Sequence, residues 1–358
     1  MVQIRVFHHG KAFYKCLEDE LRGAKKEILL NVYSFHDDSI GKKLLAVLKE
    51  KAKEGVAIKI ILDGLGSRHD GREIAMELEA TGIDLKIFRP RSYYLYHHPV
   101  FFLRRDHARI FLIDRKLLGL GGICIGEIYN ERQDLSVLLE ISYADPIVSF
   151  FEYLWALADR NDVPLVFQEN YPHLHPLSSD ISALISTPIK REQSIRRWYL
   201  DRIKNAKRRI VVVSTWFLPA RDLLRELMAA KARGVHVAIA TPFHTDKRWY
   251  DYFRGSAIPQ LLYKNVEWYG IKEYFHQKFS VIDDDWCLGS ANFDMISMDR
   301  NYELNICGHG GPVLGELENN FKKMVSEGES ITRTRMARIM RRIGKVVYPL
   351  LEFFMVAN

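Results

Sequence analysis

The chain has 358 residues, with 52 lysines and arginines against 45 aspartates and glutamates, so its net charge is +7 and its pI is near 9.0. Hydrophobic residues make up 47% of it and charged residues 27%, which excludes a disordered or fibrous protein and is typical of a soluble globular one. This length suits two domains, and the basic balance favours an anionic partner, either nucleic acid or anionic lipid headgroups.

Cysteine usage and hydropathy exclude further classes. The four cysteines are widely spaced and form no Cys-x2-Cys pair, which argues against a structural zinc site and against a disulfide framework. The first residues contain no long apolar core, so no signal peptide is evident. No stretch approaches the ~18 consecutive apolar residues of a membrane-spanning helix.

Helices and strands are predicted to alternate along the first part of the chain. In order, the apolar spacing predicts a helix over 13–21, a strand over 28–33, a helix around 44–48, a strand over 56–62, a helix over 70–80 and a strand over 83–88. Such alternation predicts an α/β fold with a mixed, mostly parallel sheet flanked by helices.

The second part of the chain repeats the first. Residues 24–28 (AKKEI) correspond to residues 206–210 (AKRRI), and a Gly-Val pair after a basic helix begins a strand at 55 and again at 234. These matches indicate one duplicated unit and therefore two pseudo-symmetric halves. The expected division is an N-terminal half over 1–160, a linker over 161–190, a C-terminal half over 191–330 and a tail over 331–358.

Each half contains a histidine followed two residues later by a cation. His107 and Arg109 in the first half match His276 and Lys278 in the second. Residues 279–282 are β-prone, which predicts a strand, and residues i and i+2 of a strand point to the same face. Each half is therefore expected to project an imidazole and a cation into one site.

The same order of residues continues after each pair. An aspartate follows five residues after the cation, and small residues come after a turn; in chain order these are Asp114, Gly121 and Gly122 in the first half, and Asp283, Gly289, Ser290 and Asn292 in the second. A cation, hydroxyl and amide donors and a titratable nucleophile together suit a phosphoryl group. One pseudo-symmetric active site at the interface of the halves is expected.

At these residues the chain resembles the phospholipase D superfamily, which is marked by His-x-Lys-x4-Asp and a following Gly-Ser/Gly-x-Asn, carried twice. The second copy fits fully. The first has Arg109 in place of lysine, which keeps the charge, and Cys124 about where the asparagine is expected. Cys124 removes an amide donor from that half of the phosphate cradle, and we interpret it as a packing residue rather than a nucleophile.

Two histidines on one phosphate define a reaction without metal or cofactor. One attacks phosphorus and becomes a phosphohistidine, while the other protonates the leaving alcohol and then deprotonates the incoming alcohol or water. The resemblance implies that His107 is the nucleophile and His276 the acid and base; the sequence alone leaves that order open. The residues expected to hold the phosphate oxygens are Arg109, Lys278, Ser290, Asn292 and Gly122.

A nucleophilic histidine needs an acceptor on its other nitrogen, as in Ser-His-Asp sites. Asp134 follows His107 at the same distance at which Glu303 follows His276, so we predict these carboxylates to orient the histidines. Asp114 and Asp283 complete the predicted catalytic set, with a favoured role in fixing the turns.

The positions of five other polar residues allow two interpretations each. Asp63 and His36, at predicted strand ends, line the cleft or belong to ordinary turns. Glu127, Arg132 and Arg300 follow the glycine turns and form either rim contacts or structural ion pairs.

Within the superfamily, the chain is most similar to bacterial cardiolipin synthases, from about residue 11 to 325. The matching segments are 33–38 (YSFHDD), 63–67 (DGLGS), 121–126 (GGICIG), 132–134 (RQD), 289–294 (GSANFD) and 301–305 (NYELN). The resemblance implies phosphatidyl transfer between glycerophospholipids such as phosphatidylglycerol. Hydrolysis as in phospholipase D, a nuclease of the same superfamily and a non-catalytic lipid-binding protein are the alternatives. Nucleases are commonly one-motif dimers, so nucleic acid is the disfavoured partner.

The last 28 residues combine an apolar stripe with many arginines and no nearby acid over 333–345. This pattern predicts an interfacial anchor on anionic lipid, and hence a peripheral protein on the cytoplasmic face of a membrane. A helix docked on the protein is the alternative. Aromatic clusters at 93–96, 99–103 and 249–253 rim a lipid mouth or belong to core and loops. The donor lipid, the acceptor and the oligomeric state stay open.

Overall fold

The computed structural model describes residues 3–90, 104–159, 172–246, 251, 261 and 264–330. The predicted tail over 331–358 and the aromatic clusters over 93–96 and 99–103 lie outside these residues, as does most of the cluster over 249–253. Across the described ranges, no helix has both the length and the apolar character needed to cross a membrane.

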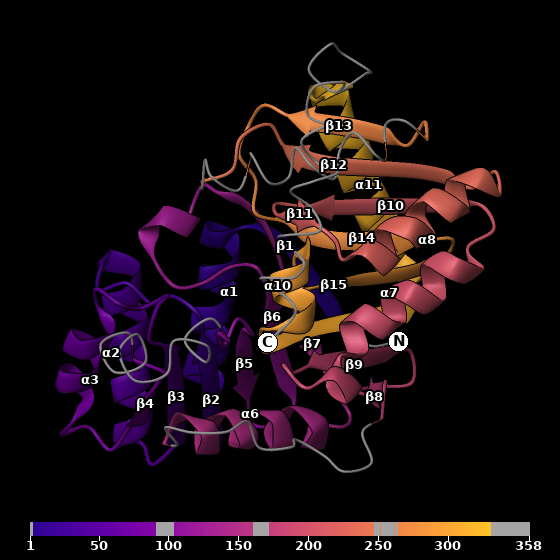
Figure 1. Cartoon of the computed structure of the whole chain (residues 1–358). Coiled ribbons are helices and arrows are strands. Elements are labelled where there is room, and N and C mark those ends of the chain that lie inside the picture. Colours follow the sequence, from indigo (N-terminus) through magenta and orange to yellow (C-terminus); the bar gives the residue numbers. More distant parts are fainter. Residues whose placement is uncertain are drawn as a thin grey trace.

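The first half is built on a seven-stranded sheet in the order β1-β7-β6-β5-β2-β3-β4 (Figure 1). Its elements are β1 (Ile4–His9), α1 (Gly10–Gly23), β2 (Glu27–Val32), α2 (Ser39–Lys53), β3 (Ala57–Asp63), α3 (Gly71–Leu78), β4 (Asp84–Phe88), β5 (Ile110–Ile113), β6 (Leu117–Gly121), the 3-10 turn η1 (Glu127–Tyr129), β7 (Gln133–Glu140) and α6 (Asp145–Ala158).

The second half is built on a nine-stranded sheet in the order β18-β13-β12-β10-β14-β15-β17-β9-β8. Its elements are β8 (His175–Pro176), β9 (Ile181–Ser186), η2 (Lys190–Glu192), α7 (Ser194–Asn205), β10 (Arg209–Ser214), β11 (Phe217–Leu218), α8 (Arg221–Ala232), β12 (His236–Pro242), β13 (Glu267–Ile271), β14 (Lys278–Ile282), β15 (Asp285–Gly289), β16 (Phe293–Asp294), α10 (Met295–Asp299), β17 (Glu303–His309), α11 (Gly311–Glu327) and β18 (Glu329–Ser330).

The α/β class with two similar halves is confirmed, and both sheets are mixed. Parallel pairing, however, is confined to β2-β3-β4 and β10-β12-β13, while the other described pairs of the two sheets are antiparallel. The expectation of a mostly parallel sheet is therefore wrong. The reason is local: the histidine motifs lie on the tight hairpins β5-β6 and β14-β15, and two strands joined by so short a turn can pair only antiparallel.

The predicted linker over 161–190 contains structure where it is described. Residues Ile181–Ser186 form β9, which pairs with β17, so the second sheet begins inside that stretch. Its apolar side chains, Ile181, Ala183 and Ile185, are buried in the core shared by the two halves. A Pro-, Ser- and His-rich composition thus concealed a strand.

The two halves pack through one continuous hydrophobic core. This core joins the inner faces of both sheets with α6 and α11. Leu112 and Ile147 of the first half belong to the same cluster of buried residues as Phe279 and Leu304 of the second. The outer face of the first sheet is covered by α1, α2 and α3, and that of the second by α7 and α8 (Figure 1). The shared core fixes the two halves relative to each other, and so fixes any site between them.

Candidate active site

Two short backbone pairings bring the motifs of the two halves together. Asp106 pairs with Tyr302, and Gln133 pairs with Phe275, both as parallel bridges. The amide of His107 donates to the carbonyl of Tyr302 at 2.9 Å, and the amide of His276 donates to the carbonyl of Gln133 at 2.7 Å. Each histidine is therefore held against the segment that carries the other half's predicted carboxylate.

The carboxylates pair with the histidines across the halves. Nδ1 of His107 lies 2.9 Å from Oε1 of Glu303, and Nδ1 of His276 lies 2.8 Å from Oδ2 of Asp134. Equal spacing in the sequence had associated each carboxylate with the histidine of its own half, and the fold exchanges them. An ionised carboxylate at Nδ1 requires that nitrogen to carry the hydrogen, which leaves Nε2 of each imidazole unprotonated; on His107 this lone pair accepts from Nη2 of Arg109 at 3.2 Å.

Electrostatics favour neutral imidazoles on ionised carboxylates. Burial, with Lys278 nearby, lowers the pKa of His276 to about 3, and burial with Arg109 lowers the pKa of His107. Burial alone would raise the pKa of Asp134 and that of Glu303, but the facing histidines bring both pKa values below the usual carboxyl range. A neutral histidine with a free Nε2 lone pair is the form that attacks an electrophile.

Both histidines line one cavity of about 250 Å³. Their side chains are mostly buried, with 13% and 14% exposed. The wall combines cations with aromatic and small polar side chains. Besides the histidines it includes Tyr33, Arg105, Arg109, Cys124, Tyr129, Arg132, Trp216, Asp246, Tyr274, Asn292, Asp294, Ile296, Ser297 and Asn301. A cationic, half-enclosed cavity of this size suits a phosphodiester headgroup.

Arg109 is fully buried beside the first histidine. Its Nη1 donates to the carbonyl of His107 at 2.6 Å, its Nη2 lies 3.2 Å from Nε2 of the same residue, and its Nε donates to Sγ of Cys124 at 3.3 Å. Cys124 therefore acts as an acceptor for the guanidinium where an asparagine was expected. Arg109 also lies over the ring of Tyr33, 5.5 Å from its centroid.

Lys278 occupies the matching place in the second half. Its Nζ donates to the carbonyl of His276 at 2.5 Å, and burial lowers its pKa to about 7. Asn292 lines the cavity nearby, and its buried Oδ1 has no hydrogen-bond partner among the described residues. Asn292 thus lies in the cavity wall, whereas Lys278 is not among the lining residues; that the two side chains hold the substrate phosphate stays a prediction.

Ser290 and Gly122 serve the carboxylates instead of the phosphate. The hydroxyl of Ser290 donates to Oε2 of Glu303 at 2.5 Å and accepts the amide of Leu304 at 2.9 Å. A Cβ at Gly122 would lie 2.0 Å from Oδ1 of Asp134, so glycine leaves room for that carboxylate. This corrects the prediction that both residues bind the substrate phosphate.

Asp114 and Asp283 lie at the far ends of the motif strands, outside the cavity. Asp114 accepts the amides of residues 25–27, and Asp283 accepts those of residues 207–209. Both have φ near +50°, the left-handed region, which is uncommon for a residue with a side chain. They fix the hairpin turns, which corrects their inclusion among the catalytic residues.

The residues left with two interpretations, in the cleft or away from it, fall into both groups. Arg132 lines the cavity, stacked on Tyr129 and Tyr274 with ring distances of 5.4 and 5.0 Å, so it is a rim cation. Asp63 is fully buried and holds Arg105 at 2.9 Å, so it supports the wall from behind.

The other three of these residues, His36, Glu127 and Arg300, do not line the cavity. His36 bonds Asp70 at 3.1 Å through Nδ1, and Glu127 accepts from Ser39, and neither lines the cavity.

Sequence reasoning missed several wall residues. Arg105, Trp216 and Tyr274 are not in either motif and come together only through the fold. Asp294 was quoted only as part of a matching segment; burial raises its pKa to about 7, and it caps α10 through the amide of Ser297. Tyr33, in the matching segment 33–38, was the one aromatic wall residue whose position in the sequence pointed to the site.

Comparison with known proteins agrees with this duplicated arrangement. A family described as "Cardiolipin synthase, PLD-like domain" matches residues 17–155 and 199–325, and each matched segment contains one histidine motif. The chain is 28% identical over 339 residues to a probable cardiolipin synthase of Bacillus subtilis, covering 92% of this chain and 67% of that protein. It is also 28% identical over 370 residues to a cardiolipin synthase of Clostridium perfringens, covering 97% and 77%.

A solved structure shows the same fold. Phosphatidylserine synthase from Haemophilus influenzae superposes with a TM-score of 0.75 at 13% identity, covering 99% of this chain and 95% of that one. At this identity the likeness concerns the fold alone.

Proposed function

The chain belongs to the family of cardiolipin synthases with phospholipase D-like domains, and from this premise we propose that it transfers phosphatidyl groups between glycerophospholipids. The observation that carries the proposal is the pair of neutral, carboxylate-oriented histidines that line one cationic cavity. Transfer proceeds through a covalent phosphohistidine. Phospholipid substrates such as phosphatidylglycerol are the donors and acceptors.

The first step forms the covalent intermediate. Nε2 of His107 attacks phosphorus of the donor phosphodiester, and the P–O bond to the leaving alcohol breaks. His276, protonated on Nε2 when substrate is bound, gives that proton to the departing oxygen and becomes neutral. Glu303 stabilises the positive charge that develops on His107.

The second step reverses the first with a new alcohol. Neutral His276 takes the proton of the incoming hydroxyl, whose oxygen attacks phosphorus as the P–N bond to His107 breaks. The products are the new phosphodiester and a free His107 Nε2. Arg109, Lys278 and the amide of Asn292 hold the negative charge of the phosphoryl oxygens in both steps.

The bound phosphate explains how His276 obtains its proton. In the free site, burial and Lys278 keep the pKa of this residue near 3. A phosphodiester placed in the cavity adds one negative charge beside the imidazole, and an opposite charge within a few ångströms favours the protonated form. Substrate binding and protonation of the general acid are therefore coupled.

We also place the protein at a membrane surface, on the cytoplasmic side. The net charge of +7 and the basic, apolar tail over 331–358 support contact with anionic lipid. Hydrolysis competes with transfer whenever water reaches the intermediate, so phospholipase D activity is the nearest alternative. A nuclease is the other, and it shares the same chemistry.

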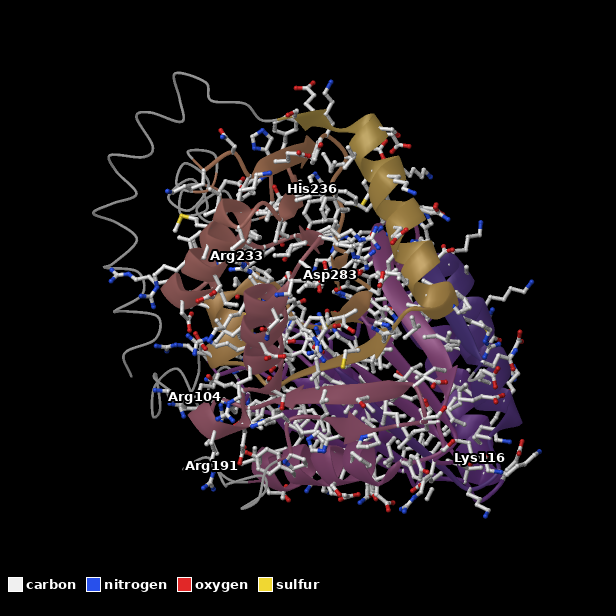
Figure 2. All side chains as sticks on the ribbon, turned by 90° about the vertical axis from the view of Figure 1, so that its right-hand side faces the viewer. Arg104, Lys116, Arg191, Arg233, His236 and Asp283 are labelled. Carbon is white, nitrogen blue, oxygen red and sulfur yellow. The ribbon has the colours of Figure 1, made fainter. Side chains whose placement is uncertain are left out.

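The test is incubation of the protein with vesicles of phosphatidylglycerol and, separately, with DNA, followed by mass spectrometry of the lipids formed. We expect a two-phosphate lipid and free glycerol, with no DNA cleavage. His107→Ala and His276→Ala should each abolish product formation. His236→Ala is the matched control, because this histidine, labelled in Figure 2, is half-exposed and is not among the residues that line the cavity. DNA cleavage without lipid turnover would overturn the proposal.

A further inference from the structure

A buried carboxyl group and a buried amide group contact each other at the start of the first histidine motif. Asp106, the residue before the histidine, is 0% exposed, and Asn31 in β2 is 1% exposed. Nδ2 of Asn31 donates to Oδ1 of Asp106 at 3.0 Å. The other oxygen of each group, Oδ2 of Asp106 and Oδ1 of Asn31, is buried and has no hydrogen-bond partner among the described residues. Two neighbouring groups thus present two unpaired acceptors and lack one donor.

A single proton supplies the missing donor. A carboxylate only accepts hydrogen bonds, whereas a carboxylic acid also has an O–H group that donates. An acid already linked to an amide by one N–H···O bond can close a ring with a second bond, from its O–H to the amide oxygen. That ring pairs both oxygens at once, and leaving them unpaired in the interior is costly.

The charges around Asp106 oppose a further negative group. Its amide donates to Oδ2 of Asp63 at 3.1 Å, so this carboxylate at the end of β3 lies against the backbone here. The guanidinium of Arg105 binds the Asp63 carboxylate at 2.9 Å. Burial raises the pKa of Asp106 most, and the charges of Asp63 and Glu303 raise it further, to about 8, against the lowering effect of its own hydrogen bonds. The imidazole of His107, next in the chain, is neutral and supplies no compensating charge.

The same carboxyl group is tied to the backbone around the nucleophile. Oδ1 of Asp106 also accepts the amide of Ala108 at 3.3 Å, so this side chain connects the residues on either side of His107. The backbone of Asp106 pairs with Tyr302, and the amide of His107 donates to the carbonyl of Tyr302. A change at this carboxyl group therefore acts on the segment that sets the His107 ring against Glu303.

We propose that Asp106 is a neutral carboxylic acid in the folded enzyme, joined to the amide of Asn31 by two hydrogen bonds, and that it acts as a positioning residue for His107. The proton remains on Oδ2 of Asp106 throughout the reaction. Its loss at high pH breaks the second bond and adds a further buried carboxylate beside Asp63 and Glu303. The kinetic part of this inference rests on the proposed function, whereas the protonation state is independent of it.

Infrared difference spectroscopy measures the protonation state directly. The carbonyl stretching band of a carboxylic acid is separate from the bands of carboxylates and amides. At pH 6 the spectrum of the wild type minus that of Asp106→Asn should contain one such band. Asp134→Asn is the matched control: burial raises the pKa of Asp134, but the facing His276 brings it below the usual range, so its difference spectrum should contain no acid band. Absence of the band from the Asp106 spectrum would overturn the inference.

The pH profile of the first chemical step tests the positioning role. This step is followed as the burst of p-nitrophenol from a saturating p-nitrophenyl phosphodiester, so that changes in substrate affinity do not enter. The wild-type burst rate should fall about ten-fold between pH 7 and 9, because a group with a pKa of about 8 goes from about nine-tenths to one-tenth protonated. The Asp106→Asn rate should stay constant over this range, because an amide forms the same two bonds with Asn31 and does not titrate.

A surface variant controls for the loss of one carboxylate. Asp285→Asn removes a partly exposed carboxylate that pairs with His309, and it should keep the wild-type profile. The same alkaline loss in Asp106→Asn as in the wild type would overturn the positioning role. A wild-type protein without any burst would count against the proposed function, and the inference would then be decided by the infrared band alone.

Discussion

The two halves of the active site share a scaffold and differ in the groups that complete it. Each half presents a histidine whose Nδ1 faces a buried carboxylate from the other half, at 2.9 and 2.8 Å. Around the first histidine stands a permanently charged Arg109 bonded to Cys124, whereas the second has Lys278, with its pKa lowered to about 7, and Asn292. The fold therefore places the two histidines symmetrically, while the different cations and hydrogen-bond donors around them give the two histidines different roles.

The strongest test of the difference between the two histidines is a substrate whose leaving group needs no general acid. With a natural alcohol as leaving group, His107→Ala should lower the rate at least ~10⁴-fold, because the nucleophile is lost. His276→Ala should lower it ~10²–10⁴-fold, the range of lost general acid catalysis. A p-nitrophenyl phosphodiester releases p-nitrophenolate, a stable anion that departs without being protonated by a general acid. We therefore expect the His276→Ala variant, and not the His107→Ala variant, to release a burst of p-nitrophenol.

Phosphopeptide mapping of the quenched burst should place the phosphoryl group on His107. The control is His236→Ala, which should behave as wild type with both substrates. A burst from the His107→Ala variant, with phosphate found on His276, would reverse the two roles and leave the rest of the site unchanged.

Neutralising one carboxylate at a time sharpens the comparison further. Asp134→Asn and Glu303→Gln should each lower turnover by roughly 10²–10⁴-fold, since an amide no longer holds the correct tautomer or stabilises the imidazolium. Because the pairs cross, Glu303→Gln should abolish the p-nitrophenol burst from His107. Asp134→Asn should spare that burst and impair transfer to alcohols.

If the carboxylates served the histidines of their own halves, the two phenotypes would be exchanged. Asp285→Asn is a suitable control, because this partly exposed carboxylate pairs with the surface residue His309. It should leave both activities intact.

The pairing of each histidine with the carboxylate of the other half could not be predicted from the sequence. Local patterns predicted the alternating elements, the duplication and the paired motifs, because each depends on residues near one another in the chain. Spacing alone could not show that Glu303 serves His107, since this depends on how the halves pack. Ser290 was misassigned for a similar reason: its hydroxyl is a good phosphate donor in isolation, and only the fold shows that Glu303 takes it.

The cavity wall depends on long-range packing too. Arg105 is held by Asp63 at the end of β3, and Trp216 follows β10 in the second half. Neither residue stands in a motif.

The difference between the two cations predicts a pH effect of several-fold. Lys278 loses its proton in the free enzyme as the pH rises through about 7, whereas Arg109 stays charged. Bound phosphate favours the charged lysine, so substrate binding above pH 7 takes up a proton and KM should rise with pH. Lys278→Arg should flatten the KM profile between pH 7 and 9.

Arg109→Lys is the reciprocal variant and should steepen the same profile, because it introduces a second cation that titrates in the buried site. KM and kcat are measured separately at each pH, so that a loss of catalysis is not taken for a loss of binding. A wild-type KM that is constant from pH 6 to 9 would contradict the interpretation of Lys278 as a titrating phosphate ligand.

Substitution of the turn aspartates Asp114 and Asp283 should have the smallest effect on catalysis, but it should lower stability. Burial would raise the pKa values of Asp114 and Asp283, but three backbone amides on each lower them below the usual range. Their stabilisation is therefore present above the unfolded value of about 3.9 and is lost as the pH falls through the lower, folded value. Asp114→Asn and Asp283→Asn should each cost about 1–2 kcal/mol of unfolding free energy at pH 7, since both side chains are partly exposed. Denaturant titration at pH 7 and at pH 3 measures this, and the cost should shrink at pH 3. At a temperature where the variants are folded, kcat should be unchanged; a large loss of kcat in a folded Asp283→Asn variant would return this residue to the catalytic set.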